Sequence, residues 1–173
     1  MTSDNERALM HLAAAADTAM RAHGTAGFPL EVCGFLVGRD TPAGRDVRDA
    51  WPVRNAWEDD PELRQRLFAS LEAAGAEKSA GDWESAQEER RFLVSPQDQL
   101  HAMRRARQAG MDLVGVYHTH PNHPAVPSGY DRDLAWPGWS YVILSVRDGI
   151  AEELRSWTLD EAGQFAEEPI VLT

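Results

Sequence analysis

The chain has 173 residues, 43% hydrophobic and 26% charged, which is typical of a globular protein long enough to bury a core. Seventeen basic and twenty-eight acidic residues give a formal net charge of −11, so there is no basic surplus for binding nucleic acid. The single cysteine, Cys33, excludes an internal disulfide and fits a cytoplasmic location, and the sequence has neither a signal-peptide pattern nor an apolar run long enough for a membrane span.

The first third of the chain predicts one helix followed by strands. The helical segment is rich in alanine and poor in helix breakers until His23-Gly24. The first strand follows Pro29 and ends at Gly38. The predicted elements are a helix from Asn5 to Arg21, a strand from Glu31 to Val37, a turn from Arg39 to Arg45 and an interrupted strand from Val47 to Val53.

The stretch 58–91 differs from the rest of the chain in its polarity. It holds ten acidic and five basic residues. Its first part, from Pro61 to Glu77, predicts a helix with its apolar residues on one stripe, and the remainder predicts a mobile loop. We interpret the stretch as an insertion within a single domain spanning 1–173.

The second half predicts alternating strands and helices. Ser95-Pro96 has the arrangement preferred at the first positions of a helix, with a capping hydroxyl followed by proline. The predicted elements are a strand at 92–94, a helix that starts at Ser95-Pro96 and runs to about Ala109, and a strand at 111–117. Two more strands, at 141–146 and 154–158, are separated by a turn at 147–149. This order predicts an α/β or α+β fold with a mixed sheet.

The most informative motif is His118-Thr119-His120-Pro121, which follows the strand at 111–117. Residues two apart on a strand point to the same side, about 6.6 Å apart along the chain, so both imidazoles can reach one metal ion. Pro121 cannot donate to a sheet and is expected to end the strand. Two unrelated histidines remain an alternative explanation of the pattern.

Ser128 and Asp131 follow at a spacing that has two compatible explanations. Ser-x-x-Asp before an apolar run is a helix-capping signature, with Ser128 at the N-cap and Asp131 at the third helical position. A carboxylate on the first turn of a short helix can also reach an ion beside the strand, and Asp is an accepted zinc ligand.

Together these residues resemble the motif of the JAMM (MPN+) zinc metalloproteases. That family also has a glutamate on an early strand, and Glu31 in Phe-Pro-Leu-Glu-Val-Cys-Gly-Phe-Leu-Val-Gly matches its setting. The local patterns at 122–127 and 135–141 are similar to those of small bacterial and archaeal members, and the resemblance covers about residues 5–158 without 58–91. It implies an α/β (α+β), MPN-like (cytidine-deaminase-like) single domain, with a mixed β-sheet flanked by helices.

The resemblance also implies a metallopeptidase site. In it His118, His120 and Asp131 hold one Zn²⁺ per chain, which leaves a fourth position for water. Glu31 is the implied general base and Ser128 the implied donor to the oxyanion. Zinc is favoured by the ligands, and iron remains an alternative because metal choice also follows availability.

The implied substrate is a ubiquitin-like sulfur-carrier protein, cleaved after its C-terminal Gly-Gly. The alternatives are a deconjugase of a bacterial ubiquitin-like or antiphage system, a small-molecule zinc amidohydrolase and an inactive MPN scaffold. The scaffold is disfavoured because all five motif positions are present. For 58–91 the sequence leaves open a cover over the site, a contact with the carrier and a contact in a homodimer.

Four further residues invite a functional interpretation. His123 is near the motif, but a fourth protein ligand would close the water position, so we predict a loop residue. Cys33 is predicted on the strand face that carries Glu31, as a buried thiol rather than a ligand. Trp136 and Trp139 are predicted to be packing residues.

Overall fold

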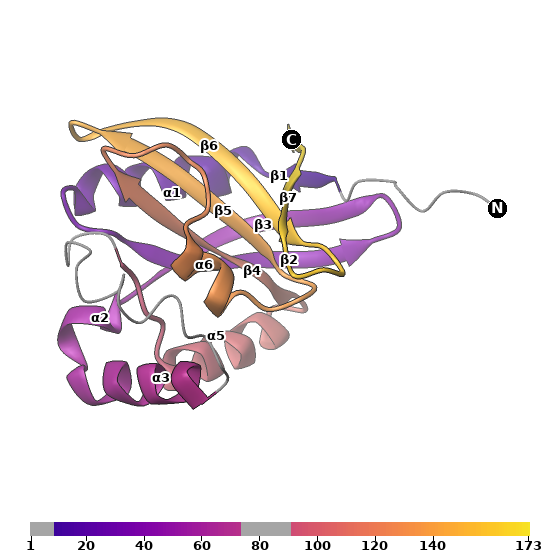
Figure 1. The fold of residues 1–173 in the computed structure, drawn as a ribbon. Coiled ribbons are helices and arrows are strands. Elements are labelled where there is room, and N and C mark those ends of the chain that lie inside the picture. The colour runs from indigo at the N-terminus through magenta and orange to yellow at the C-terminus, as the bar shows by residue number, and fades with distance from the viewer. Residues whose placement is uncertain (1–8, 74–90) are drawn as a thin grey trace.

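One mixed sheet organises the fold in a computed structural model that describes residues 9–73 and 91–173. Within those residues its strand order is β7-β6-β5-β4-β2-β3-β1-β8. Figure 1 shows the sheet, with β1 to β7 labelled. The strands are β1 (Met10–Leu12), β2 (Cys33–Thr41), β3 (Gly44–Val53), β4 (Asp112–Pro121), β5 (Ser140–Arg147), β6 (Ile150–Leu159), β7 (Phe165–Glu168) and β8 (Ile170–Leu172). The helices are α1 (Ala14–Gly27), α2 (Ala56–Asp59), α3 (Pro61–Ala73), α5 (Pro96–Gln108) and α6 (Gly129–Leu134).

Helices cover both faces of the sheet. Successive side chains of a strand point to opposite faces. Leu36 of β2 accordingly packs in one cluster with Met20 of α1, while Phe35 packs in another with Ala102 and Ala106 of α5. The sheet therefore divides two apolar cores, and the face under α5, which carries Val116, also carries His118 and His120 of β4.

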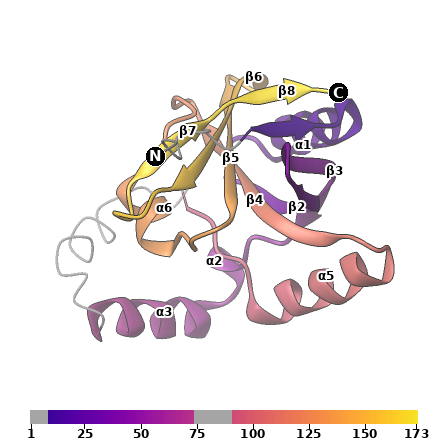
Figure 2. The same ribbon diagram turned by 90° about the vertical axis from the view of Figure 1, so that its right-hand side faces the viewer.

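The C-terminal residues join the two ends of the sheet. β7 pairs with β6 at one end and β8 pairs with β1 at the other, with only Pro169 between them, so the sheet is strongly curled (Figure 2). Next to this junction the buried Glu168 accepts hydrogen bonds of 2.6 Å from the hydroxyls of Ser140 and Ser156. Arg45 of β3 donates to Ser140 across 2.7 Å. Burial raises the pKa of Glu168, although these hydrogen bonds and Arg45 act against it.

A third, smaller core lies beside α6 and includes part of the predicted insertion. Trp57 of α2 packs edge-on against Tyr130 of α6 and against Phe68 of α3, with ring centroids 5.7 and 5.8 Å apart. The helix predicted from Pro61 is confirmed as far as Ala73. Residues 74–90, including the predicted loop, lie outside the described residues.

The local elements of the second half are mostly as predicted. α5 begins at Pro96 with Ser95 as its N-cap, and its hydroxyl accepts from the backbone N–H of Asp98. β4 ends at Pro121, and β5 and β6 are longer versions of the two predicted strands. The mixed sheet flanked by helices is confirmed. None of the helices in residues 9–73 and 91–173 is long and apolar enough to cross a membrane.

Several boundaries and several short elements were predicted wrongly. Residues 10–12, placed in the first helix, form β1, and α1 starts at Ala14 and passes through Gly24 to Gly27. Gly24 fits inside the helix because it faces β5, where a Cβ would meet Leu144 at 2.9 Å. The turn predicted at 39–45 shortens to residues 42–43, and 92–94 is not a strand. β7 and β8 were not predicted. Residues 5–8 of the predicted helix lie outside the described residues.

Candidate metal centre and active site

Three side chains from two elements converge at the end of β4. His118 and His120 are two residues apart on this strand and point to one side, as their spacing predicts. Asp131 comes from the first turn of α6. The Nε2 atoms of the two histidines are 3.1 Å apart, and Asp131 Oδ1 lies 3.1 Å from Nε2 of His118. Asp131 Oδ2 lies 3.6 Å from Nε2 of His120.

The spacing of these atoms fits a tetrahedral metal site. Zinc binds imidazole nitrogen and carboxylate oxygen at about 2.0–2.2 Å, so two ligands of a tetrahedron are separated by about 3.4 Å. The three observed separations, from 3.1 to 3.6 Å, bracket that value. His118, His120 and Asp131 are also all buried, which removes competing water from most directions.

The protonation of the two histidines also suits metal binding. Nδ1 of His120 lies 2.9 Å from the carbonyl oxygen of Pro124, which can only accept, so Nδ1 carries the hydrogen and Nε2 keeps its lone pair. His118 is fully buried and stacks on Phe92 with ring centroids 4.4 Å apart. Burial lowers the pKa of His118 even though Asp131 opposes this, so the imidazole is neutral at pH 7.

Asp131 is held in place by a capping box, as the sequence predicts. Ser128 Oγ accepts from the backbone N–H of Asp131 across 3.1 Å and donates to Asp131 Oδ2 across 2.7 Å. The backbone N–H of Ser128 donates to the same oxygen across 2.6 Å. Burial alone would raise the pKa of Asp131, but the neighbouring His118 and His120 hold it well below the usual range. The carboxylate is therefore ionised at neutral pH, as a metal ligand must be.

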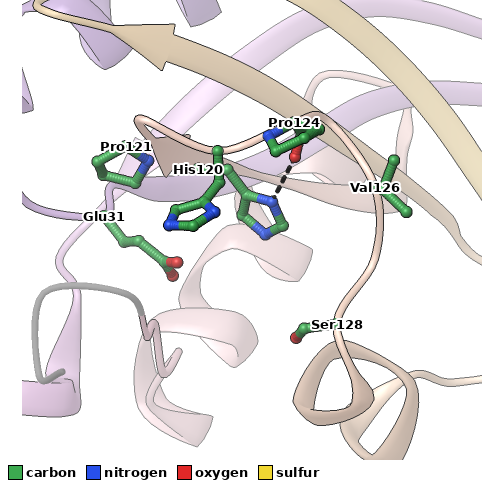
Figure 3. Close-up of a pocket in the computed structure, with 7 residues that line it drawn as sticks. Glu31, His120, Pro121, Pro124, Val126 and Ser128 are labelled. Atoms are coloured by element: carbon green, nitrogen blue, oxygen red, sulfur yellow. Dashed lines mark hydrogen bonds between the residues drawn. The ribbon is translucent and has the colours of Figure 1, made fainter. Parts of the chain in front are cut away.

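Glu31 and Ser128 both line a cavity of about 230 Å³ beside the three ligating side chains. Figure 3 shows the two residues on opposite sides of His120, which also lines the cavity. Glu31 is only 5% exposed and precedes the first residue of β2, whereas the sequence placed it within the strand. Its neighbour Val32 is fixed by Thr119, whose hydroxyl accepts from the Val32 N–H across 3.0 Å.

Thr119 was not singled out from the sequence. It lies between His118 and His120, and its backbone N–H also donates to the Val32 carbonyl across 3.0 Å. Because adjacent side chains on a strand face opposite ways, Thr119 bonds the neighbour of Glu31 while the histidines face Asp131. The position of Thr119 within His-x-His could have shown from the sequence that its side chain faces away from the histidines. Its bonding partner Val32 could not be found in this way, because it is distant in sequence.

The other four residues considered from the sequence have different outcomes. Cys33 is buried opposite His118 in the β2–β4 register, so the predicted burial of its thiol is confirmed, and this burial raises the pKa of the thiol. His123 lines the cavity but is not part of the three-residue cluster. Trp139 packs partly buried against the core under α5, as predicted, whereas the prediction for Trp136 is wrong because 70% of it is exposed.

Residues 13–160 match the family described as prokaryotic homologs of the JAB domain. The chain belongs to this family. It is 33% identical over 157 residues to the desampylase of Haloferax volcanii, which covers 88% of this chain and 90% of that protein. The desampylase of Pyrococcus furiosus is 31% identical over 143 residues, covering 83% and 76%. Over 77 residues the chain is 34% identical to a probable TtuB-protein conjugate cleaving protease of Thermus thermophilus, covering 43% and 47%.

Two solved structures have a fold similar to that of this chain. A protein of Desulfitobacterium hafniense aligns with a TM-score of 0.69 and 27% identity, covering 95% of this chain and 93% of that one. A Salinibacter ruber protein aligns with a TM-score of 0.59 and 34% identity, covering 90% and 86%. The JAB chain described here is therefore a hydrolase of the JAMM type, with the MPN-like fold that the sequence predicted.

Proposed function

We propose that this JAB hydrolase is a zinc-dependent isopeptidase or peptidase that cleaves the amide bond after the C-terminal Gly-Gly of a ubiquitin-like sulfur-carrier protein. The observation that carries the proposal is the cluster of His118, His120 and Asp131 beside a cavity lined by Glu31 and Ser128. Two relatives named desampylase and one named for cleaving TtuB-protein conjugates support a ubiquitin-like substrate.

In this proposal the two histidines and Asp131 hold one Zn²⁺. The neutral imidazole of His118 and the ionised carboxylate of Asp131 are in the protonation states that metal binding requires. Bound zinc supplies Lewis acidity, which lowers the pKa of water to about 7 and polarises a carbonyl group. With three protein ligands a fourth position stays available for chemistry, and we expect His123 to stay outside the ligand set.

Glu31 is the proton carrier of the reaction. Its carboxylate accepts the proton of the attacking water and then transfers it to the nitrogen of the leaving amine. A carboxylate that is 5% exposed and lines the same cavity as His120 is sheltered from bulk water, which would otherwise exchange that proton. Two hydrogen bonds between Val32 and Thr119, one to the Thr119 hydroxyl and one from its backbone N–H, hold this segment against β4.

Ser128 stabilises the oxyanion that forms when water attacks the carbonyl carbon. Its hydroxyl donates to Asp131 Oδ2 in the structure, so this role requires rotation of the O–H bond toward the cavity. The rotation leaves the metal ligand supported, because the backbone N–H of Ser128 still donates to Asp131 Oδ2 across 2.6 Å. One hydroxyl therefore serves the ligand in the resting enzyme and the substrate during the reaction.

The substrate tail is expected to enter as an extended strand of small residues. The cavity is walled by Pro121, the last residue of β4, and by Pro124 and Val126 of the loop that follows it. Glycine fits beside such walls because it has no side chain to collide with them. The relatives' names favour a second candidate in the same site, which is release of a ubiquitin-like modifier from a protein conjugate.

We further propose that 58–91 is an insertion bordering this cleft. In its described part, Phe68 packs against Trp57, which precedes the insertion, and Trp57 in turn packs against Tyr130, the residue before Asp131. The insertion is therefore connected to α6, the helix that carries Asp131. Replacing residues 74–90 with a short Gly-Ser linker should raise KM with kcat unchanged. An unchanged KM would remove those residues from substrate binding. The homodimer and the cytoplasmic location stay predictions, and sedimentation of the purified chain tests the former.

The test of the proposed function begins with metal content, measured by plasma mass spectrometry. Wild type should hold about one zinc per chain, and a His118→Ala/His120→Ala variant none. The matched control is His123→Ala, which alters the same cavity wall outside the cluster and should keep its zinc. No stoichiometric metal in the wild type after zinc is added back would remove the metal site.

Turnover then separates the candidates. Wild type is incubated with a carrier bearing a linear C-terminal extension after Gly-Gly, with a lysine-linked conjugate, and with each of these carrying Ala-Ala in place of Gly-Gly. Cleavage of the linear extension supports processing, cleavage of the conjugate alone supports the deconjugase, and equal cleavage of the Ala-Ala forms contradicts both. Glu31→Gln should abolish turnover with zinc still bound, and retained activity would disprove its role as base.

A further inference from the structure

Asn55 connects the segment that carries Glu31 to two other parts of the chain. It lies after the last residue of β3 and is the N-cap of α2. Its amide nitrogen donates to the carbonyl oxygens of Glu31 and Arg91, across 3.1 and 2.8 Å. Its amide oxygen accepts from the backbone N–H groups of Trp57 and Leu93, across 3.0 and 2.9 Å. One side chain thus bonds four backbone groups.

These four bonds use the full capacity of the amide. The side chain has two N–H donors and one oxygen with two lone pairs, and each is paired. Because two partners are carbonyls and two are N–H groups, exchanging the nitrogen and oxygen would break every bond. The orientation of Asn55 is therefore fixed by its surroundings, and no other residue type offers this set of donors and acceptors at the same length.

The position of Glu31 makes this connection relevant to the reaction. Glu31 precedes β2, so its carbonyl lies before the first residue of the strand. Thr119 fixes Val32 from the β4 side, and Asn55 fixes the carbonyl of Glu31 from the α2 side. The backbone that projects the Glu31 carboxylate is thereby held between the strand of the metal ligands and the cap of α2.

The Asn55 amide is also connected to the metal site through residues 91–93. Between its partners Arg91 and Leu93 lies Phe92, whose ring stacks on the metal-ligating His118 with centroids 4.4 Å apart. The hydroxyl of Tyr130 on α6 donates to the carbonyl of Phe92 across 2.9 Å. The segment fastened by Asn55 therefore also packs against β4 and α6, the two elements that carry the ligands.

We propose that Asn55 is a positioning residue for catalysis, which sets the general base Glu31 relative to the metal site by fixing its backbone carbonyl. The inference rests on the proposed function, in which Glu31 moves the proton. Since the base must lie within hydrogen-bond reach of the atoms it serves, a displacement of about 1 Å lowers the rate by up to about 10². The metal ligands are on other elements, so zinc content is preserved.

Two substitutions isolate the bonds to the carbonyls. Asn55→Asp keeps an acceptor for Trp57 and Leu93 and a good N-cap, but it replaces the donor that faces Glu31 with an oxygen. Asn55→Ser is also a good N-cap and adds no charge, so it separates the lost donor from the new carboxylate. The matched control is Ser95→Ala, which removes the N-cap of the longer helix α5 without altering any of these bonds.

The readouts are kcat, KM and zinc content of the metal-loaded enzymes, together with amide hydrogen exchange in a peptide containing residues 31–33. Both Asn55 variants should lose about 10- to 100-fold in kcat, with KM within about threefold and zinc unchanged. Exchange at 31–33 should become faster. Ser95→Ala should change neither kcat nor that exchange. If Asn55 had a structural role alone, all three variants would lose stability, and the Asn55 variants would not differ from Ser95→Ala in kcat or in exchange at 31–33.

The outcomes that overturn the proposal are distinct from those that overturn the proposed function. If both Asn55 variants keep the kcat of Ser95→Ala, or if exchange at 31–33 is unchanged, Asn55 does not position Glu31. If wild type cleaves no Gly-Gly substrate, the proposed function fails. In that case the exchange measurement still decides whether Asn55 holds the backbone at residue 31.

Discussion

Replacing Ser128 with alanine would remove the side-chain half of the capping box of α6 and leave its backbone half intact. The hydroxyl accepts from the Asp131 N–H across 3.1 Å and donates to Asp131 Oδ2 across 2.7 Å. The N–H of Ser128 would still donate to the same carboxylate oxygen. Asp131 is 6% exposed, so water cannot fully replace the lost bonds.

The size of the effect follows from these two bonds. Losing a serine N-cap costs about 1 kcal/mol in the free energy of unfolding. Losing a hydrogen bond to a charged group costs about 1.5–3 kcal/mol. The bonds join the same two residues and do not add fully, so we expect Ser128→Ala to lower the stability of the metal-free protein by about 2–3 kcal/mol. For a chain of this length each kcal/mol lowers Tm by about 2–4 °C.

Ser128→Ala should also lower the rate of catalysis, by a mechanism that is separate from the loss of stability. With zinc bound and substrate saturating, Ser128→Ala should lower kcat by about 10²–10³, the usual effect of losing one oxyanion donor. Ser128→Thr is the matched control because it keeps a hydroxyl that caps and donates, and it should retain most of both properties. Urea unfolding of the metal-free proteins gives the first quantity, and stopped assays on the Gly-Gly substrate give the second.

Two results would refute parts of this reasoning. If Ser128→Ala binds zinc and keeps the wild-type kcat, the hydroxyl is a helix cap only and the oxyanion is stabilised elsewhere. If the metal-free variant unfolds at the wild-type urea midpoint, the bonds to Asp131 contribute nothing net, and Asp131 is held by other groups.

Three further predictions concern stability. Gly34→Ala would place a Cβ inside contact distance of the Tyr117 ring and the Trp51 carbonyl, so it should lower the free energy of unfolding by more than about 3 kcal/mol. Gly129→Ala has open space around it and should change that free energy by under about 1 kcal/mol, and urea unfolding measures both. Because burial raises the pKa of Glu168, the contribution of this residue to stability is full below the unfolded value near 4.5 and is lost as the pH rises through the folded value. Glu168→Gln should therefore become less destabilising from pH 4 to 8, and a constant difference in urea midpoints across that range would contradict this. Finally, zinc at a thousandfold excess over Kd should stabilise wild type by about 4 kcal/mol in thermal unfolding with and without chelator, and a metal-site variant should show no response.

The parts of the site that the sequence predicted are those set by local periodicity. Residues that are two apart on a strand point to the same side of it, wherever the strand lies in the fold. His118 and His120 therefore had to face the same way. The Ser128–Asp131 capping box closes within one helical turn and needs no distant partner. The cap of α5 at Ser95 was predictable for the same reason.

The prediction errors have a common cause, which is pairing between distant residues. Residues 10–12 have a helical composition but form β1, because β3 and the C-terminal β8 bond to their two sides. The apolar run 92–94 suggested a strand, yet its N–H at Leu93 bonds to Asn55 and the ring of Phe92 stacks on His118. Such tertiary contacts override the secondary-structure propensity of a segment. They could not be predicted from the sequence, since each forms only once the chain has folded.

The sequence alone therefore determined the ligand types, the side of β4 that they occupy and the cap that orients Asp131. Only the tertiary structure brought Asp131 within 3.1 Å of His118 and placed Glu31 ahead of β2, between Thr119 and Asn55. The physical reason is that a spacing of two or three residues is fixed by backbone geometry, whereas bonds spanning 24 or 87 residues depend on how the sheet and helices pack.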